Sequence, residues 1–242
     1  MRALLTLVLL LACGLAGAAP PIPDFQARYG IYKGPLKIGE ATRTLGHDAE
    51  GPFYRSVTEP VGIAAWVVDL RLDDFSRIRW IDDRPRPLYY RQRREGRHPR
   101  LIEQTYDWQA MVAHSRYNGE PFDIPLTADA VDQNMYLLAL MADLAAGRTP
   151  RALHVVEGKK MKTYRIETLG RRRLDTPWGE MEAVGLARRG KKERTTLWCA
   201  PRLRYLPVLI VHDGDGGRLE GRLETVEGLG PLPRRAGGED WE

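Results

Sequence analysis

The chain has 242 residues, a formal net charge of +5 and two cysteines, Cys13 and Cys199. A chain of this length buries about 70% of the surface that its unfolded form exposes, so its core needs no disulfide. Because Cys13 lies in a segment that we expect to be removed, Cys199 has no partner, which excludes an internal disulfide.

The first residues have the features of a secretory signal peptide. Met1-Arg2 is a short positive start, residues 3–12 are apolar, and Ala16-Gly17-Ala18 supplies small residues for cleavage. The apolar run is too short to span a bilayer, and no comparable run follows it. We therefore expect residues 1–18 to be removed and the mature protein to be exported and soluble, without a transmembrane segment.

Cys13 offers an alternative to simple release. The sequence Leu10-Leu11-Ala12-Cys13 loosely resembles the box at which bacterial lipoproteins are cleaved and acylated, which would anchor the product to a membrane. Leu11 matches that box poorly, and the signal would be very short. We therefore favour release over lipoprotein anchoring.

Removal of 18 residues from 242 leaves 224, a length that one all-β domain routinely occupies. Residues 19–23 predict a short extended leader, and residues 24–229 predict a single domain. Glycine, proline and charged residues dominate from Gly228 onward, so we expect residues 230–242 to be a disordered tail.

Alternating apolar and polar residues, separated by turn residues, predict many strands. Turns are expected at residues 46–52 and 84–87, the second because two prolines interrupt the pattern, and at Asn118-Gly119, a strong hairpin signal. The strands are expected at residues 25–33, 36–45, 53–58, 70–81, 88–94, 101–108, 111–117, 121–124, 153–156, 161–169, 173–176, 181–187, 195–199, 206–212 and 218–226.

Residues 61–68, VGIAAWVV, form the longest apolar run after the signal. Periodicity alone does not distinguish a doubly buried strand from an apolar loop. We favour burial in the core; the alternative is a mobile lip in which Trp66 touches a lipid or guards a cavity mouth.

Residues 130–146, AVDQNMYLLALMADLAA, predict the one convincing helix. Asp129 is a plausible N-cap, and Gly147 is the usual residue just past a helix end. Its polar residues, Asp132, Tyr136 and Asp143, share one stripe, and apolar residues cover the rest of its circumference. Such a helix must be covered, so we expect a mainly β fold: a large curved antiparallel sheet, or a partly closed barrel, with one buried helix.

The basic residues are clustered, for example Arg91, Arg93 and Arg97 near one expected hairpin tip. In an exported protein we expect no nucleic-acid partner, and anionic lipid head groups or acidic glycans are the natural candidates. The simpler interpretation is that basic hairpin tips keep strand ends soluble and discourage edge pairing.

Signatures of catalysis and metal binding are lacking in the sequence. It contains no Gly-x-Ser-x-Gly elbow, no phosphate-binding glycine loop, and no His-x-x-x-His or Cys-x-x-Cys pair. Cys199 is expected to be a small buried hydrophobe, since a reactive thiol would need a nearby base. Asp73-Asp74 and Asp82-Asp83 would point to opposite faces of a strand, so solvation of the surface explains them. We expect no metal, cofactor or catalytic residue.

Several segments resemble a known family. They are Gly34-Pro35-Leu36-Lys37-Ile38-Gly39-Glu40-Ala41, Tyr106-Asp107-Trp108, Val131-Asp132-Gln133, Leu197-Trp198-Cys199-Ala200-Pro201 and Tyr205-Leu206-Pro207-Val208. Together they resemble the exported bacterial family called domain of unknown function 3108, over about residues 24–229. The resemblance implies a mainly β periplasmic protein without an established activity, and it brings no functional residue with it.

The combined pattern favours a noncatalytic envelope protein that binds or carries a lipid or another hydrophobic ligand. The expected ligand contacts are Trp66, Met135, Leu138, Met141 and Trp198, and Arg91, Arg93 and Arg97 would attract an anionic head group. One alternative is a structural or assembly factor that binds another envelope protein through a sheet edge or residues 61–68. A hydrolase of cell-wall material is a third, which would require clustered carboxylates.

Overall fold

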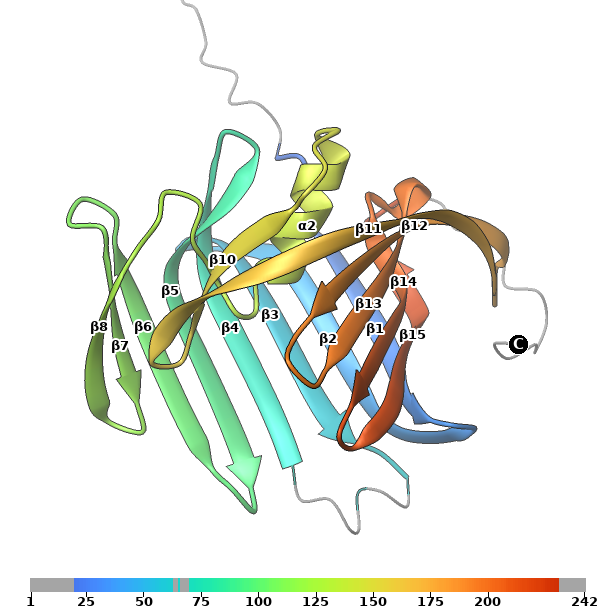
Figure 1. Cartoon of the computed structure of the whole chain (residues 1–242), viewed down its shortest axis with the longest axis horizontal. Helices are drawn as coiled ribbons and strands as arrows, with labels where there is room; N and C mark the ends of the chain where they lie inside the picture. Colours follow the sequence, from blue (N-terminus) through green and yellow to red (C-terminus); the bar gives the residue numbers. More distant parts are fainter. Residues whose placement is uncertain (1–19, 63–64, 66–69, 231–242) are drawn as a thin grey trace, which may run out of the picture.

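The computed structural model describes residues 20–62, 65 and 70–230. Within these residues the chain forms a single sheet of 15 strands around one α-helix (Figure 1). The expectation of a mainly β protein with a large curved sheet and one buried helix is confirmed. The predicted signal peptide with Cys13, most of the apolar run including Trp66, and all but the first residue of the predicted tail lie outside the described residues.

The first half of the chain contributes eight strands joined mostly by short turns, as its alternating pattern predicts. They are β1 (Phe25–Lys33), β2 (Leu36–Asp48), β3 (Gly51–Pro60), β4 (Leu70–Ile81), β5 (Arg84–Gly96), β6 (Arg100–Asp107), β7 (Val112–Tyr117) and β8 (Glu120–Pro125).

The second half begins with a two-residue strand and the helix and then returns to hairpins. Its elements are β9 (Val131–Asp132), α2 (Tyr136–Ala145), β10 (Ala152–Glu157), β11 (Lys160–Thr176), β12 (Gly179–Arg189), β13 (Arg194–Ala200), the short 3-10 helix η1 (Pro201–Leu203), β14 (Leu206–Gly214) and β15 (Gly217–Glu227).

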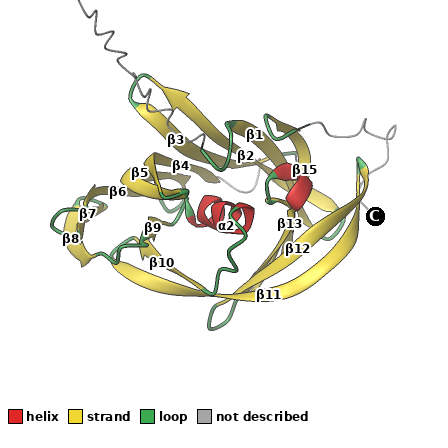
Figure 2. Ribbon diagram, turned by 90° about the horizontal axis from the view of Figure 1, so that it is seen from above, coloured by secondary structure: helices red, strands yellow, loops and turns green. Residues whose placement is uncertain are grey.

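The strand order is β8-β7-β6-β5-β4-β3-β2-β1-β15-β14-β13-β12-β11-β10-β9. The first and last strands of the chain pair with each other, so β1 and β15 join the two halves into one sheet. Seen from above, the sheet curls around α2, and β10 and β11 cross toward β8 (Figure 2). The end strands β8 and β9 are not neighbours in the hydrogen-bonded order, so the barrel is partly closed.

Edge strand β8 carries two prolines, Pro121 and Pro125. Proline has no N–H to offer an incoming strand, and its presence on an edge discourages pairing with other chains. The sequence therefore protects the edge that the incomplete barrel exposes.

The helix fills the enclosure with apolar side chains. Met135, Leu138 and Met141 are fully buried, and they belong to one large core cluster with residues of β1 and β14, including Tyr29 and Val208. The Tyr29 hydroxyl donates a 2.8 Å hydrogen bond to the Pro207 carbonyl oxygen, which satisfies the one polar atom of that ring.

The helix is shorter at its start than the sequence predicts: it begins at Tyr136, not Ala130. Val131 and Asp132 pair in parallel with β10 instead. Asp129 is not the N-cap, because Met135 occupies that position; Asp129 lies against His154 instead, 3.0 Å from Nδ1. Oδ1 of Asp132 accepts hydrogen bonds from the backbone N–H groups of Asn134 and Met135, at 2.9 and 2.8 Å, and so forms the turn that leads into the helix.

The predicted end of the helix is confirmed. Gly147 has φ of +72° and its N–H donates to the Leu144 carbonyl oxygen, while the Arg148 N–H donates to that of Asp143. This pair of bonds is the Schellman arrangement, which requires a left-handed residue directly after the helix.

Two turn predictions were wrong. Residues 46–48 and 51–52 continue β2 and β3, which leaves a tighter turn between them. The chain reverses at Asp82 and Asp83, both with positive φ, so residues 84–87 lie within β5. Pro85 and Pro87 are tolerated there because β6 pairs with β5 only from Tyr89 onward.

We expect Leu138→Ala to lower the free energy of unfolding by about 2–5 kcal/mol, because the side chain is fully buried and its loss leaves a cavity. Urea denaturation measures this change. Leu36→Ala is the matched control: Leu36 is 55% exposed, so its substitution should change stability by about 0.5 kcal/mol or less. Equal losses in the two variants would contradict the burial of the helix.

Candidate functional site

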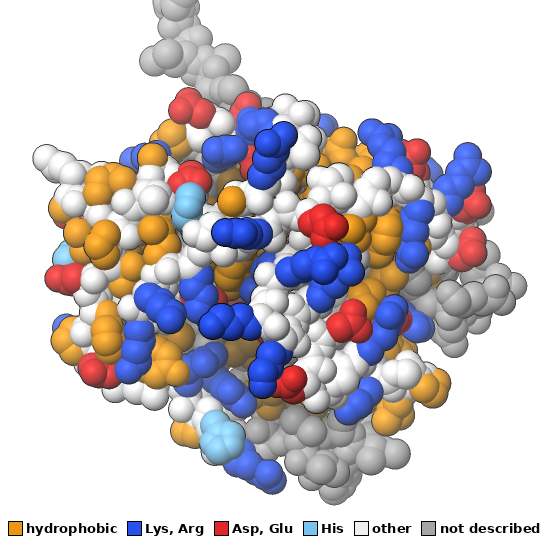
Figure 3. Space-filling model, viewed as in Figure 1, with side chains coloured by type: hydrophobic (Ala, Val, Ile, Leu, Met, Phe, Trp, Pro, Cys, Tyr) orange, Lys and Arg blue, Asp and Glu red, His pale blue; other side chains and the backbone are white. Residues whose placement is uncertain are grey.

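The largest of the clefts described here has a volume of about 1300 Å³ and lies between the tips of three hairpins, β10–β11, β12–β13 and β14–β15. Lys and Arg side chains gather around the middle of the face in Figure 3, where this cleft opens. Its wall holds more basic than acidic residues: Lys160, Lys162, Arg165, Arg188, Arg189, Lys191 and Lys192 against Glu157, Glu193 and Asp215. We call it the basic cleft.

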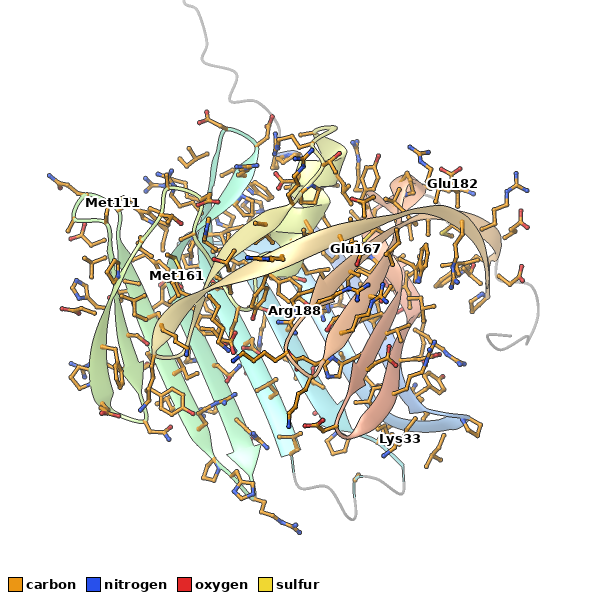
Figure 4. The ribbon with its side chains drawn as sticks, in the orientation of Figure 1. Lys33, Met111, Met161, Glu167, Glu182 and Arg188 are labelled. Carbon is orange, nitrogen blue, oxygen red and sulfur yellow. The ribbon has the colours of Figure 1, made fainter. Side chains whose placement is uncertain are left out.

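Arg188 is the most enclosed cation of the basic cleft. Its guanidinium carbon lies 4.4 Å from the centroid of the Tyr164 ring, and its Nη2 donates to Oε1 of Glu193 at 3.0 Å. The ring and the carboxylate hold the guanidinium in place from two sides. Arg188 and Met161, both labelled in Figure 4, come from adjacent strands β12 and β11, so the cleft combines a cation with apolar surface.

Glu157 is the acidic residue of the cleft whose carboxylate accepts two side-chain hydrogen bonds. Its carboxylate accepts hydrogen bonds from Nζ of Lys162 at 2.8 Å and from the Tyr164 hydroxyl at 2.7 Å. Burial works against ionisation, but these two bonds prevail and hold the pKa of Glu157 below its usual value. Glu157 is therefore ionised and neutralises Lys162.

Four other cations of the basic cleft have no acidic partner within the described part of the chain: Lys160, Arg165, Lys191 and Lys192. All four are exposed. Their positive potential attracts anions, and ionic strength screens it.

A second cleft, of about 610 Å³, lies on the other side of the β10–β11 hairpin. It shares Glu157, Lys160 and Lys162 with the basic cleft, and Arg100 and Gln133 belong to its remaining wall. The hairpin is therefore the common wall of two adjoining clefts.

The tip of this hairpin is fastened to the opposite side of the barrel. The carbonyl oxygen of Gly158 accepts hydrogen bonds from Oγ of Ser115 at 2.6 Å and from Nε2 of Gln104 at 3.3 Å. Nζ of Lys159 lies 2.8 Å from Oε2 of Glu120. We call these contacts the latch, because they join the hairpin to β6, β7 and β8, with which it has no strand pairing in the described residues.

Behind the latch, the inner face of the sheet carries a buried polar network. Oδ1 of Asp74 accepts from the Tyr90 hydroxyl at 2.5 Å and from Nε2 of Gln92 at 2.8 Å, and Oε1 of Gln92 accepts from Nη2 of Arg100. Asp74 is only 7% exposed, so explaining it by solvation was wrong. Its neighbour Asp73 does face outward and pairs with Arg55.

Asp132 is a second buried carboxyl, at 0% exposure. Burial raises its pKa to about 7, although hydrogen bonds from the backbone of Met135 and Asn134 and from the Ser76 side chain act in the opposite direction. The sequence indicated no such group, because an isolated aspartate beside a helix is usually exposed.

The residues predicted to contact a hydrophobic ligand are not gathered at the clefts. Met135, Leu138 and Met141 lie in the core between helix and sheet. Trp198 is partly buried against the same core cluster, with the guanidinium of Arg172 4.0 Å from its ring centroid. Trp66 lies outside the described residues. A ligand-binding role for these residues stays a prediction.

The predicted head-group residues lie on another surface. Arg91 and Arg93 alternate with buried Gln92 on β5, so they face outward, and Arg97 is exposed in the turn that follows. Nη1 of Arg93 lies 3.9 Å from Glu95. None of the three lines the basic cleft.

Cys199 is buried as expected, and burial raises the pKa of its thiol to about 12. The described residues include no group of three or more His, Cys, Asp or Glu side chains placed to hold a metal ion. Among the same residues, no helix has the length and apolar character required to cross a membrane.

Residues 24–224 match the family described as "Protein of unknown function (DUF3108)". The chain belongs to this family. The resemblance found in the sequence is thus confirmed over most of the chain. No curated protein matches the DUF3108 chain.

Among solved structures, this DUF3108 chain is similar to the "Beta-barrel-like Protein of Domain of Unknown Function DUF1849 from Brucella abortus". The two share 10% sequence identity with a TM-score of 0.54, and the match covers 88% of this chain and 100% of the other. At this identity the likeness shows the fold alone, and it agrees with a partly closed barrel.

The raised pKa of Asp132 predicts a pH-dependent stability for this DUF3108 protein. The carboxyl has a pKa of about 4 when unfolded and about 7 when folded, so between these values the folded state holds a proton that the unfolded state has lost. This contribution therefore makes the free energy of unfolding fall as pH rises from about 4 to about 7, by at most about 1.4 kcal/mol per pH unit.

Asp132→Asn isolates this contribution, because its side-chain oxygen still accepts the turn hydrogen bonds but cannot titrate. Urea denaturation across this pH range should show the variant gaining stability relative to the unmodified protein as pH rises. Parallel pH profiles for the two proteins would contradict the assignment.

The latch predicts a second local effect. Ser115→Ala removes the shorter of the two side-chain bonds to Gly158, so amide hydrogen exchange should accelerate in residues 155–162. Thr105→Ala, an exposed hydroxyl on β6, is the control and should leave these amides unchanged. Unaltered exchange in Ser115→Ala would mean that the hairpin is held by other contacts.

Proposed function

We propose that this protein is a noncatalytic periplasmic binding protein for an amphipathic ligand of the lipid class, held in the basic cleft. The observation that carries the proposal is the composition of that cleft, in which cations and apolar side chains share one wall. A ligand with an acidic head and an acyl chain matches both kinds of surface.

The size of the cleft supports this choice. Small-molecule sites are typically about 300–1,000 Å³, and the basic cleft has about 1300 Å³. The adjoining cleft behind the β10–β11 hairpin adds about 610 Å³. The two clefts together are therefore large enough to hold a ligand with an acyl chain.

Binding without chemistry fits the side chains present. Met161 and Leu219 supply apolar contact, and Lys160 and Lys192 supply charge. The Cys199 thiol is buried with a raised pKa, so it is a poor nucleophile. The periplasmic location rests on the signal sequence of residues 1–18.

The assembly-factor alternative has less support. A partner that adds a strand to the sheet needs backbone N–H groups on an exposed edge. On β8 two of these groups are missing, at Pro121 and Pro125.

Delipidated protein should take up a fluorescent fatty acid with a dissociation constant on the order of micromolar. Lys160→Glu combined with Lys192→Glu should weaken binding on the order of tenfold, because two exposed cations of the cleft become anions. Fluorescence titration at fixed ionic strength measures both values.

Arg116→Glu combined with Arg151→Glu is the matched control. Both arginines are exposed, neither lines the described clefts, and the change in net charge is the same. Binding should be nearly unchanged in this variant. Absence of uptake by the unmodified protein would remove the proposal, and equal losses in both double variants would place the ligand outside the basic cleft.

A further inference from the structure

We infer that Arg94 and Arg100 form the site for the acidic group of the ligand, a carboxylate or a phosphate. This inference rests on the proposed function and assigns the head group to one pair of side chains on the inner face of β5 and β6. The exposed lysines at the rim of the basic cleft would then only attract the ligand.

The strand register brings the two arginines together. Arg94 and Arg100 are direct cross-strand partners, next to the partners Gln92 and Ile102. Gln92 and Ile102 are each 2% exposed, and alternation along the strands places both arginines on the same inner face. Two like charges directly opposite each other are destabilising unless something compensates them.

No acidic side chain in the described part of the chain supplies that compensation. Neither Arg94 nor Arg100 has an acidic partner among the described residues, and the Nε atoms of both are shielded from solvent without a hydrogen-bond partner. A buried donor that lacks a partner is costly, more so when it is charged. An anion between the two guanidinium groups would remove both costs.

Arg100 is already held in position. Its Nη2 donates to Oε1 of Gln92, and the Gln92 amide is itself fixed by donating to Asp74. Cζ of the guanidinium also lies 6.0 Å from the ring centroid of Tyr117. A planar guanidinium with a fixed orientation can bind a carboxylate or phosphate through two parallel hydrogen bonds.

The nearest carboxyl of the network does not neutralise the pair. Oδ1 of Asp74 is occupied by the Tyr90 hydroxyl and the Gln92 amide. Burial raises the pKa of Asp74 above its usual value, although the hydrogen bonds from Tyr90 and Gln92 act in the opposite direction. Ser56 is the cross-strand neighbour of Asp74 and is 9% exposed. Its buried hydroxyl has no hydrogen-bond partner in the described structure, so it is also available to a bound polar group.

The clefts connect the pair with the proposed ligand site. Both arginines line a shallow cleft of about 540 Å³ at the end of β5 and β6. Arg100 also lines the 610 Å³ cleft, which shares Lys160 and Lys162 with the basic cleft. A ligand could therefore place its acidic end at Arg100 and its chain along the β10–β11 hairpin.

The test compares three ligands with the same acyl chain: a fatty acid, a lysophosphatidic acid and a neutral monoacylglycerol. Arg100→Gln and Arg94→Gln should each weaken binding of at least one anionic ligand on the order of 10- to 100-fold, because a charge-assisted hydrogen bond is lost. Binding of the monoacylglycerol should change little. Whichever anion loses more affinity identifies the carboxylate or the phosphate as the preferred group.

Arg116→Gln is the matched control, since it removes one exposed charge that lines none of these clefts. It should weaken anion binding only about twofold at low salt, and the effect should vanish at high salt, whereas the effect of Arg100→Gln should persist. Arg100→Lys keeps the charge but loses the planar fork, so it should fall between the two.

The outcomes separate this inference from the proposed function. If none of the three ligands binds the unmodified protein, the proposed function is wrong. If they bind and both arginine variants keep full affinity for the anions, only the arginine site is wrong. Equal loss of the neutral and anionic ligands in the arginine variants would also overturn it, because the residues would then support the structure and not the head group.

Discussion

The burial of α2 is the constraint on which the rest of the structure depends. Leu137, Leu138, Leu140 and Met141 are at most 1% exposed, so the helix needs apolar partners around nearly its whole circumference. A flat sheet covers only one side of a helix, and a sheet of 15 strands curled around it covers the others. The helix thus occupies the apolar part of the enclosure.

Because the helix takes that space, the basic cleft and its adjoining cleft are elsewhere and have a different chemistry. They lie around the β10–β11 hairpin, where Arg188, Lys162 and Arg100 meet apolar side chains such as Met161. An incompletely closed barrel permits this, since the latch at Gly158 fastens the hairpin without a continuous ladder. A few side-chain bonds can open more easily than a strand pairing.

The charges that line the clefts are unevenly compensated. Glu157 pairs with Lys162, and Glu193 pairs with Arg188. The charges of these two cations are therefore compensated by carboxylates of the same chain. Arg94 and Arg100 have no such partner among the described residues, while the buried carboxyls Asp74 and Asp132 have pKa values raised toward the neutral form. This imbalance is the basis for proposing an anionic ligand, since a charged donor that is shielded from water without a partner is costly.

The sequence by itself determined the strand-rich architecture and the buried helix with its glycine end, because alternation, helical periodicity and turn residues are local signals. The sequence also indicated the family, through the segments that resemble it. It did not locate the clefts. Asp74, Gln92 and Arg100 are far from Lys162 and Arg188 along the chain, and only the curling of the sheet brings β5 and β6 against the β10–β11 hairpin. Alternation along a strand predicts which residues share a face. Whether that face lies toward water or inside the barrel depends on how the barrel closes, which only the tertiary structure decides.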